Sequence, residues 1–503
     1  MVGGESDFDA HTRVFAKDVA TISQHSPADG PSSSPGPKSN EAGDGQTVSG
    51  SAPSTGSINR FRVPGRLRVA RAIFAGGKSQ STAARLQLTV ATSMLILVAN
   101  VGSGIALART LGPTGRGILT AAMLFGALIV SIGGLGIGEA LVYRSGRAGN
   151  GKSPALVTAL YMGAAQSVVL ILVGWIIVPF LLRGRPHPTA DLALAYLAII
   201  PLYLLSQYPL AILQGRLRLV EFNLVRASTP IFYTAALFLL WRLGAMTVQR
   251  ALIASLASFG VASALALGAS ARFSTWRASV AEAHQLVGYG VRSHIGNLAV
   301  IIGAQLDVLV LTASVSASNL GYYAVAISAA GIGSLIPTAA SIVLFPTFAN
   351  QSGEAVRRTL ARFLLWGLGG AFVLGPVLVL LVPWAVVPVY GPAFAAAAAI
   401  SQILVPGFLL RGGSLMLVAI LRGSGTPLRA SVGQIIGLLV LFTLLPIGIS
   451  KFGPEGAAWA VTISAAAGFI WLLVTALKYG HMSYGYATEI WRSDFARLRP
   501  APR

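Results

Sequence analysis

Long apolar runs dominate the chain from Leu86 to about residue 477. Each run reaches about 20 residues, the length that an α-helix needs to cross the hydrocarbon core of a bilayer. Lipid offers the backbone no hydrogen bonds, so a segment that crosses it closes its hydrogen bonds within a helix. The pattern predicts about twelve membrane helices, at roughly 86–108, 118–140, 155–182, 190–213, 224–244, 251–271, 286–313, 320–346, 360–384, 394–421, 427–450 and 455–477.

The apolar region contains an internal sequence repeat with an offset of about 208 residues. Val173, Trp175, Ile177, Val178 and Pro179 recur as Val382, Trp384, Val386, Val387 and Pro388. Leu111-Gly112 recurs as Leu320-Gly321, and 211–215 recurs as 419–423. An even number of helices in each half gives both halves the same orientation, so an axis along the membrane normal is expected to relate them. The sequence therefore predicts an all-α integral membrane protein with two parallel six-helix repeats around a central cavity.

Composition divides the rest of the chain. The first 85 residues are rich in Ser, Gly, Pro and Asp and lack an apolar run, which is typical of disorder and unlike a signal peptide. The segment from Phe61 to Phe74 mixes Arg with apolar residues, as expected either for a basic tether or for a short interfacial segment. The predicted parts are a disordered cytoplasmic tail (1–58), a basic juxtamembrane segment (59–85), an N-terminal six-helix bundle (86–271), a cytoplasmic linker (272–285), a C-terminal six-helix bundle (286–478) and a basic cytoplasmic tail (479–503).

Charge supports a membrane protein and sets its orientation. Charged residues make up 11% of the chain and hydrophobic residues 54%, whereas soluble proteins carry about 25% charged residues. Near the predicted spans, 25 Lys and Arg residues fall on the side of the termini and seven on the other side. This asymmetry follows the positive-inside rule and predicts a multi-pass protein of the cytoplasmic membrane with both termini inside. The positive-inside rule therefore accounts for the net charge of +21, and nucleic acid is not an expected partner.

Several chemistries are excluded or disfavoured. The chain has no Cys, and its six His residues are scattered, so neither a metal site nor a cofactor is expected. Gly146, Gly151, Lys152 and Ser153 match a phosphate-loop pattern, but a membrane helix precedes them and Pro154 follows, so a basic turn is expected instead. The short outward loops hold only Asp191 and Glu455 as acids, too few for a membrane-embedded glycosyltransferase or polymerase. The chain is expected not to be an enzyme.

Several short motifs resemble one transporter family. They are Ala108-Arg109-Thr110-Leu111-Gly112-Pro113 with Gly115-Arg116-Gly117, Leu320-Gly321-Tyr322-Tyr323-Ala324-Val325-Ala326, Phe345-Pro346, Leu421 with Gly423 and Gly425, and Gly453 with Gly456-Ala457-Ala458. In order and spacing they resemble the bacterial polysaccharide and O-antigen flippases of the multidrug/oligosaccharidyl-lipid/polysaccharide exporter (MOP) superfamily. The resemblance covers about 86–478. It implies a fold like that of the multidrug and toxic compound extrusion (MATE) transporters, and movement of lipid-linked oligosaccharides across the cytoplasmic membrane. Polysaccharide polymerase and glycosyltransferases would be the implied partners.

Three charges lie well inside predicted spans: Arg292, Asp307 and Arg411. A charge at this depth costs at least about 2.5–3.5 kcal/mol and usually faces a cavity or a partner. Arg292 and Arg411 lie at depths of roughly 10 and 15 Å from the cytoplasmic ends of their helices. Two guanidinium groups at similar depth suit a polyprenyl diphosphate, which they can bind bidentately. The alternative is that each arginine snorkels to the inner headgroups.

The seventh span carries a further pattern. Arg292, Gly296, Ala299, Gly303 and Asp307 lie on one helical face, so the small residues line either a cavity or a close helix contact. Asp307 is a candidate ion or proton site. Glu139, at the end of the second span, is expected at the membrane interface. The main rival function is a drug/cation antiporter of the same superfamily, which needs a membrane carboxylate. The two deep arginines favour an anionic substrate instead.

Overall fold

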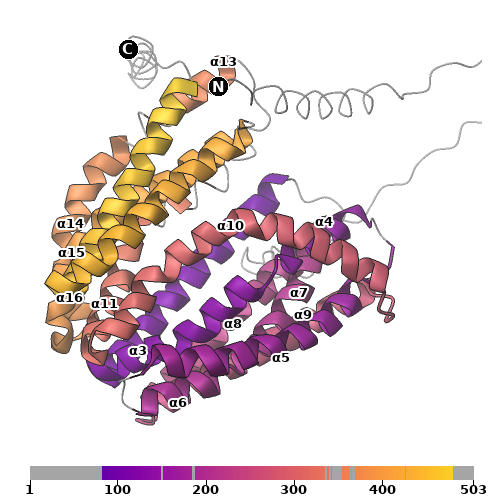
Figure 1. The fold of residues 1–503 in the computed structure, drawn as a ribbon, viewed down its shortest axis with the longest axis horizontal. Coiled ribbons are helices and arrows are strands. Elements are labelled where there is room, and N and C mark those ends of the chain that lie inside the picture. The colour runs from indigo at the N-terminus through magenta and orange to yellow at the C-terminus, as the bar shows by residue number, and fades with distance from the viewer. Residues whose placement is uncertain are drawn as a thin grey trace, which may run out of the picture. The chain divides into compact units, whose positions relative to one another are not determined.

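The computed structural model describes residues 82–148, 151–183, 187–334, 337–338, 341, 354–362, 364, 369–424 and 426–479. The predicted tail 1–58, all but the last four residues of the predicted juxtamembrane segment 59–85, and almost all of the predicted tail 479–503 lie outside these ranges. The main helices in chain order are α3 (Thr82–Gly133), α4 (Ile137–Arg147), α5 (Ala155–Leu181), α6 (His187–Tyr196), α7 (Ile199–Gly215), α8 (Leu219–Arg242), α9 (Val248–Ser270), α10 (Val280–Ser314), α11 (Ala317–Ala330), α13 (Glu354–Arg362), α14 (Gly369–Tyr390), α15 (Ala395–Gly423) and α16 (Pro427–Tyr479). No strand occurs within the described ranges, and Figure 1 shows helices throughout.

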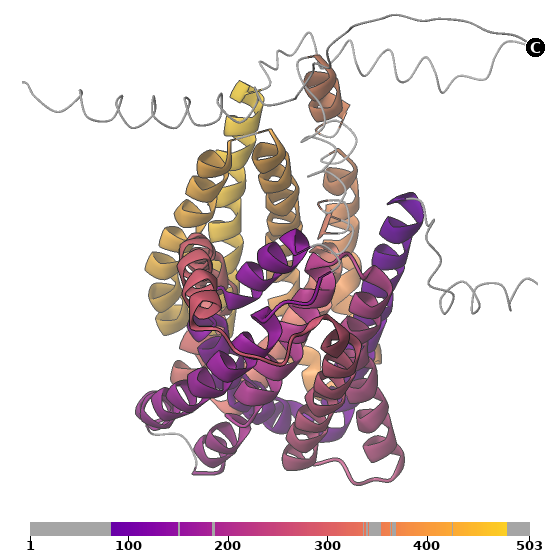
Figure 2. The same cartoon turned by 90° about the vertical axis from the view of Figure 1, so that its right-hand side faces the viewer.

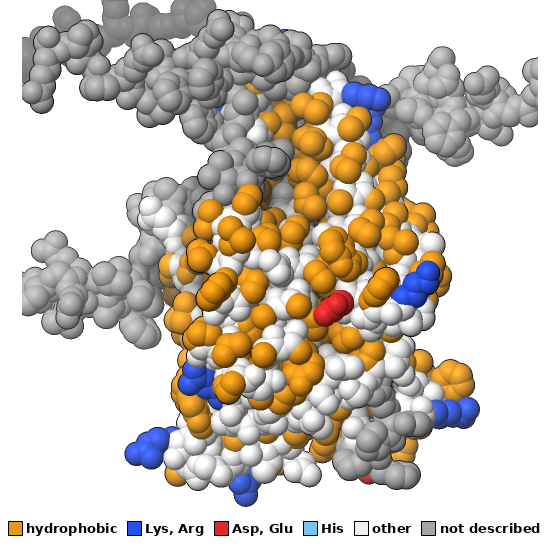
Figure 3. Space-filling view, turned by 90° about the vertical axis from the view of Figure 1, so that its left-hand side faces the viewer, with side chains coloured by type: hydrophobic (Ala, Val, Ile, Leu, Met, Phe, Trp, Pro, Cys, Tyr) orange, Lys and Arg blue, Asp and Glu red, His pale blue; other side chains and the backbone are white. Residues whose placement is uncertain are grey.

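Seven of the described helices are long and apolar enough to cross a membrane, or eight if the bent pair Val280–His294 and Leu298–Ser314 counts as one span. Two of the seven, Gln87–Gly133 and Leu428–Lys478, hold 47 and 51 residues, enough for two crossings each at about 20 residues per crossing. Orange hydrophobic side chains cover most of the face in Figure 3, and Lys and Arg lie mainly along its margins. The all-α membrane fold is confirmed, while the count of twelve stays a prediction because the eighth and ninth spans are described only in part.

Glycines break the two longest helices. Gly112 has φ 66° and ψ −178° within α3, and Gly453 has φ 57° and ψ −133° within α16. A positive φ favours glycine because it has no Cβ. A proline follows each glycine, at the first position of the next helical segment, where its missing N–H costs nothing. Each break therefore joins two membrane crossings through a single residue.

The duplicated sequence adopts a duplicated conformation. Helices α7 and α15 end at Gly215 and Gly423, and the residue after each has φ −82° with ψ 7° and 8°. Gly244 and Gly453 have φ 60° and 57° and are equivalent under nearly the same offset. Helix ends and turns thus repeat between the halves, as expected for two copies of one unit.

Each half builds its own hydrophobic core. One core contains residues of α3 to α9 and only Leu286 from α10. The other contains residues of α10, α11, α14, α15 and α16, together with Ala108, Ala121 and Leu124 from α3. In Figures 1 and 2, α10 runs between the two groups of helices, with one end beside α4 and the other near α11. Part of α3 therefore packs into the core of the C-terminal half, and Leu286 of α10 packs into the core of the N-terminal half. These two helices connect the two cores.

One close backbone approach between the halves lies beside the repeated Leu-Gly motifs. A Cβ atom added at Gly117 of α3 would overlap the Ala317 carbonyl, and one added at Gly321 of α11 would overlap the Pro113 carbonyl. Pro113 and Gly321 are nearly equivalent under the repeat offset. Equivalent points that touch must lie near the axis that relates them. We call the end of the helices with this contact the outer end; the opposite end, where α4, α7 and α15 terminate, is the inner end and the predicted cytoplasmic side.

Arg109 strengthens the contact at the outer end. Its Nε donates to the carbonyl of Val389 over 2.8 Å, and its Nη2 donates to the carbonyl of Pro388. These carbonyls belong to the last turn of α14, where no helical N–H remains to bond them and a cation is favourable. The first helix of one half thus caps the third helix of the other.

Gly117→Ala tests whether the backbone contact holds the halves together. We expect Gly117→Ala to lower the free energy of unfolding by about 1–3 kcal/mol, because the new methyl group meets a carbonyl that cannot rotate away. Gly104→Ala is the matched control in the same helix, since its Cβ would have no atom within 4 Å. Thermal unfolding of the purified variants measures both. Equal stability of the two variants would show that the contact contributes nothing.

Candidate functional site

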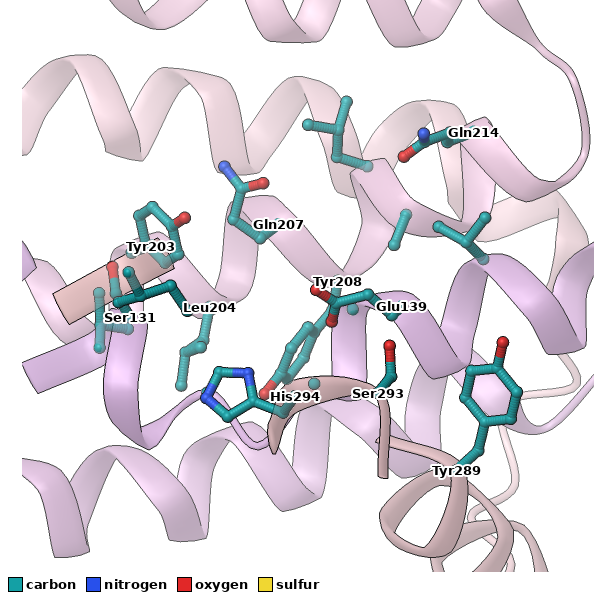
Figure 4. Close-up of a pocket in the computed structure, with 18 residues that line it drawn as sticks. Ser131, Glu139, Tyr203, Leu204, Gln207, Tyr208, Gln214, Tyr289, Ser293 and His294 are labelled. Atoms are coloured by element: carbon teal, nitrogen blue, oxygen red, sulfur yellow. The ribbon is translucent and has the colours of Figure 1, made fainter. Parts of the chain in front are cut away.

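A cavity of about 630 Å³ lies near the inner end, between the N-terminal half and the first part of α10. Its volume is within the usual range of small-molecule sites. The lining includes nine polar side chains: Ser131, Glu139, Tyr203, Gln207, Tyr208, Gln214, Tyr289, Ser293 and His294. Figure 4 shows these side chains around the cavity. The remaining lining residues are glycines and aliphatic residues.

One face of α7 separates this cavity from a second one of about 390 Å³. Tyr203, Gln207, Leu210 and Gln214 line both cavities. Their spacings of four, three and four residues place them on one side of the helix. The second cavity continues toward α8 and α9, where Arg226 and Phe259 line it. The two cavities thus adjoin along α7.

Glu139 is the charged residue of the larger cavity. It lies in the first turn of α4, and among the described residues it forms no ion pair. Neither Lys nor Arg lines this cavity. The interfacial position expected for Glu139 at the end of the second span stays a prediction, and Glu139 is exposed. The chain turns just before it, between Gly133 and Ile137, with Leu135 at φ 49° and Gly136 at φ 65°.

Hydrogen bonds fix two of the cavity walls. Tyr208 donates its hydroxyl to Oε1 of Gln166 over 2.6 Å, and Gln166 donates in turn to the Gly133 carbonyl. His294 lies 2.9 Å from the Ile132 carbonyl through Nε2. A carbonyl oxygen only accepts, so Nε2 carries the hydrogen and Nδ1 is the remaining ring atom for a ligand. Tyr208 and His294 are therefore oriented before any ligand binds.

The first part of α10 is held against α4. Arg144 donates from Nε and Nη2 to the two carboxylate oxygens of Glu282, over 2.9 and 2.6 Å. The Glu282 side chain is only 6% exposed, and Arg144 is 37% exposed. The hydrogen bond to Glu282 raises the pKa of the Arg144 guanidinium above its ordinary value. This ion pair joins the two halves at the inner end.

Ring stacking and a glycine crossing extend the same contact. Tyr143 and Tyr289 stack with centroids 4.4 Å apart and planes 14° apart, and Arg147 lies 4.5 Å above the Tyr143 ring. A Cβ atom at Gly136 or at Gly290 would overlap backbone atoms of the other segment. Glycine at both positions lets the helices approach closely. Tyr289 and His294 therefore reach the cavity from a fixed α10 segment.

The predicted diphosphate ligands lie outside both cavities. Arg292 is exposed on α10. It lies between Tyr289 and Ser293 in the sequence, but unlike them it lines neither cavity. Arg411 is half-buried in α15, and it interacts electrostatically with Asp307 and Tyr323. Within the described ranges, no hydrogen bond or ion pair joins Arg292 to Arg411. Their joint binding of a diphosphate stays a prediction.

Asp307 has partners within the C-terminal half. Its side chain is 7% exposed, and Tyr323 of α11 donates a hydroxyl to its Oδ2 over 2.7 Å. Arg411 lies close enough to attract it. Of the small residues on the same helix face, Gly303 packs near α16. A Cβ atom added at Gly303 would lie 3.5 Å from Cδ1 of Leu438, which is van der Waals contact. Ala299 is half-buried, and Gly296 lies among residues whose surroundings are not described. Gly303 thus fits a helix contact with α16.

A protein-family comparison identifies the chain. The model of the family described as polysaccharide biosynthesis protein matches residues 106–397, more than half of the sequence. The chain belongs to this family. A search of curated proteins finds no match.

Solved structures with the same fold are transporters. The lipid II flippase MurJ, in an inward closed conformation, aligns with a TM-score of 0.63 and 16% identity over 77% of this chain and 87% of that chain. An inward-facing MATE family multidrug resistance transporter of the MOP superfamily aligns with a TM-score of 0.58 and 15% identity over 79% of this chain and 99% of that chain. An outward-facing one reaches 0.52 with 16% identity over 79% and 95%. At these identities the likeness establishes the fold alone, and it confirms the predicted MATE-like architecture.

Some residues that line the cavities were not singled out from the sequence. Arg226 was counted among the cytoplasmic loop arginines, yet it lies seven residues into α8, about 10 Å along the helix, and lines the smaller cavity. The face with Tyr203, Gln207 and Gln214 was missed because it carries no charge. Its signal is polar residues at helical spacing within an apolar span.

The segment that matches the phosphate-loop pattern forms a structural turn. Ser153 accepts from the N–H of Thr275 over 3.2 Å and donates its own N–H to Phe273 over 3.0 Å. Arg216 donates to the Gly151 carbonyl over 2.7 Å and lies 4.7 Å above the Phe273 ring. The turn thus binds the ends of α7 and α9 together. Across the described ranges, His, Asp and Glu nowhere gather in a group of three that could hold a metal ion.

Arg144→Ala tests the ion pair at the inner end. We expect the free energy of unfolding to fall by about 1.5–3 kcal/mol, because the buried Glu282 carboxylate loses a charged hydrogen-bond partner. Arg147→Ala, the control on the same helix, should cost less than about 1 kcal/mol. Adding Glu282→Gln to Arg144→Ala should recover part of the loss, because the unpaired charge disappears. Chemical denaturation of the purified variants measures these differences, and equal losses for Arg144→Ala and Arg147→Ala would contradict the assignment.

Proposed function

We propose that this protein is a flippase that moves lipid-linked oligosaccharides on a polyprenyl diphosphate across the cytoplasmic membrane, for cell-surface polysaccharide biosynthesis. The observation that carries the proposal is the match to the polysaccharide biosynthesis family on a transporter fold. MurJ, whose structure has the same fold, is a lipid II flippase. Polysaccharide polymerase and glycosyltransferases are the proposed partners, and no catalytic step is assigned to the chain.

Alternating access is the proposed mechanism. The backbone contact between Gly117 and Ala317 closes the outer end, while the two cavities lie near the inner end. The higher TM-score to the inward-facing transporter than to the outward-facing one agrees with this state. In the proposed orientation both termini are cytoplasmic, so the substrate enters from the side on which it is made. Separation at the outer end and closure at the inner end would then release it outside.

Arg292 and Arg411 remain the proposed contacts to the diphosphate. Reconstituted proteoliposomes with a fluorescent lipid-linked oligosaccharide test the flippase and this site together. We expect wild-type protein to move the lipid, and Arg292→Ala or Arg411→Ala to weaken substrate engagement by roughly ten- to a hundred-fold, since a charged hydrogen bond contributes about 1.5–3 kcal/mol. Arg→Lys should restore part of the rate, because an ammonium lacks the fork geometry. Arg250→Ala, which removes an exposed guanidinium, is the control.

Two results would be decisive against these assignments. Wild-type protein that moves no lipid-linked oligosaccharide would refute the flippase. Normal flux in the Arg292→Ala/Arg411→Ala double variant would refute the diphosphate site alone, and the arginines would then be headgroup anchors.

Asp307 is the proposed ion or proton site. Its carboxylate is buried in the C-terminal half and accepts the Tyr323 hydroxyl. We expect Asp307→Asn to abolish the response of lipid flux to an imposed proton or sodium gradient at normal protein abundance. Tyr323→Phe keeps the carboxylate and should retain the response. An unchanged response in Asp307→Asn would leave Asp307 with a structural role only.

A drug/cation antiporter is the second candidate function. The observation that favours it is Glu139, a carboxylate in a cavity lined by neither Lys nor Arg. Uptake of ethidium into the same proteoliposomes, driven by a proton gradient, would support it. Family membership favours the flippase.

A further inference from the structure

The two adjoining cavities differ in charge. Glu139 lines the larger cavity together with uncharged polar side chains and His294, and no Lys or Arg lines it. Arg226 lines the smaller cavity, which has no Asp or Glu in its lining. The shared α7 face, with Gln207 and Gln214, lies between the two charges. A ligand that occupies both cavities must therefore be anionic at one end and must not be anionic at the other.

Arg226 suits the anionic end. It is half-buried on α8, and its Nη2 donates to Oγ of Ser93 over 3.2 Å. Ser93 is neutral, and no described carboxylate pairs with Arg226. A partly buried guanidinium without a counter-ion binds a phosphate oxygen favourably, and its remaining N–H groups match that geometry. Arg226 is thus a candidate phosphate contact in the smaller cavity, distinct from Arg292 and Arg411, which line neither cavity.

The larger cavity suits a sugar. Sugar hydroxyls both donate and accept hydrogen bonds, and the amides of Gln207 and Gln214 can do both in return. No described residue bonds these two amides. Glu139 adds two acceptor oxygens, and His294 adds Nδ1. Figure 4 shows the Glu139 carboxylate in the space between the α7 side chains and those of α10.

We propose that the larger cavity binds the sugar next to the diphosphate, and that Glu139 selects an uncharged or basic sugar over an acidic one. This inference rests on the proposed flippase function. The physical basis is that a sugar carboxylate in this cavity would face Glu139 without a cation in the lining, whereas a neutral sugar would donate its hydroxyls to the same oxygens. Arg226, across α7, takes up the phosphate charge. Glu139 is thus a specificity-determining residue, and Gln207 a sugar-binding one.

Three short-chain probes test this selection: farnesyl diphosphate, farnesyl diphosphate N-acetylglucosamine and farnesyl diphosphate glucuronate. Calorimetric titration of the full chain in lipid nanodiscs, without sugar detergents, measures each affinity. We expect N-acetylglucosamine to improve binding about tenfold over farnesyl diphosphate, through a few hydrogen bonds. Glucuronate should give no improvement, because its carboxylate is repelled.

Variants separate specificity from folding. Glu139→Gln should strengthen binding of the glucuronate probe about tenfold, while the affinity for farnesyl diphosphate stays unchanged and confirms an intact fold. Gln207→Ala should weaken only the N-acetylglucosamine probe, and Arg226→Ala should weaken all three. Asp191→Asn, which removes an exposed carboxylate that lines neither cavity, is the control for Glu139→Gln and should change none of them.

The outcomes distinguish this inference from the flippase proposal. If farnesyl diphosphate binds but N-acetylglucosamine adds nothing, or if Glu139→Gln changes the affinity for both sugars equally, the sugar selection is wrong and the flippase stands. If none of the three probes binds to wild-type protein, the flippase proposal and this inference both fail.

Discussion

The backbone contact between α3 and α11 is the constraint on which the arrangement of the halves depends. Gly117 and Gly321 let two helix segments meet without side chains between them, next to the Ala317 and Pro113 carbonyls. Because nearly equivalent residues meet there, the contact lies near the axis that relates the halves. With α3 and α10 each crossing into the opposite core, the halves stay joined at the outer end while cavities remain near the inner end.

Duplication gives the two halves one scaffold, but the larger described cavity draws its lining unequally from them, with α10 alone contributing from the C-terminal half. The ends of α7 and α15 have nearly the same backbone angles, yet the described cavities lie along α7. The difference comes from side chains. At the repeat offset of 208, Gln207 and Gln214 of α7 correspond to Leu415 and Arg422 of α15. The polar groups thus differ between the copies, with neutral amides on α7 and an arginine on α15, and the uncharged polar face of α7 is the one that lines the described cavities.

Much of the fold could be predicted from sequence because lipid imposes a simple rule on backbone hydrogen bonds. Apolar length located the helices, and the repeated Trp, Pro and Gly located the duplication. The site was harder to predict. The turn at Leu135 and Gly136 places Glu139 against a cavity, and no periodicity in the sequence indicates such a turn. Arg411 was paired with Arg292 by depth, and because depth along a helix does not give direction around it, their joint binding of a diphosphate stays a prediction.

The single-glycine breaks have a consequence for biogenesis. Gly112, Gly244 and Gly453 all have positive φ, and Gly112 and Gly453 leave no loop between consecutive crossings. A translocon that released the first crossing of α3 alone would leave its C-terminal carbonyls without partners. Arg109 finds its carbonyl partners only when α14 is made. The two crossings are therefore suited to leave the translocon as one helical hairpin, with Arg109 and Arg116 carried across together at its tip.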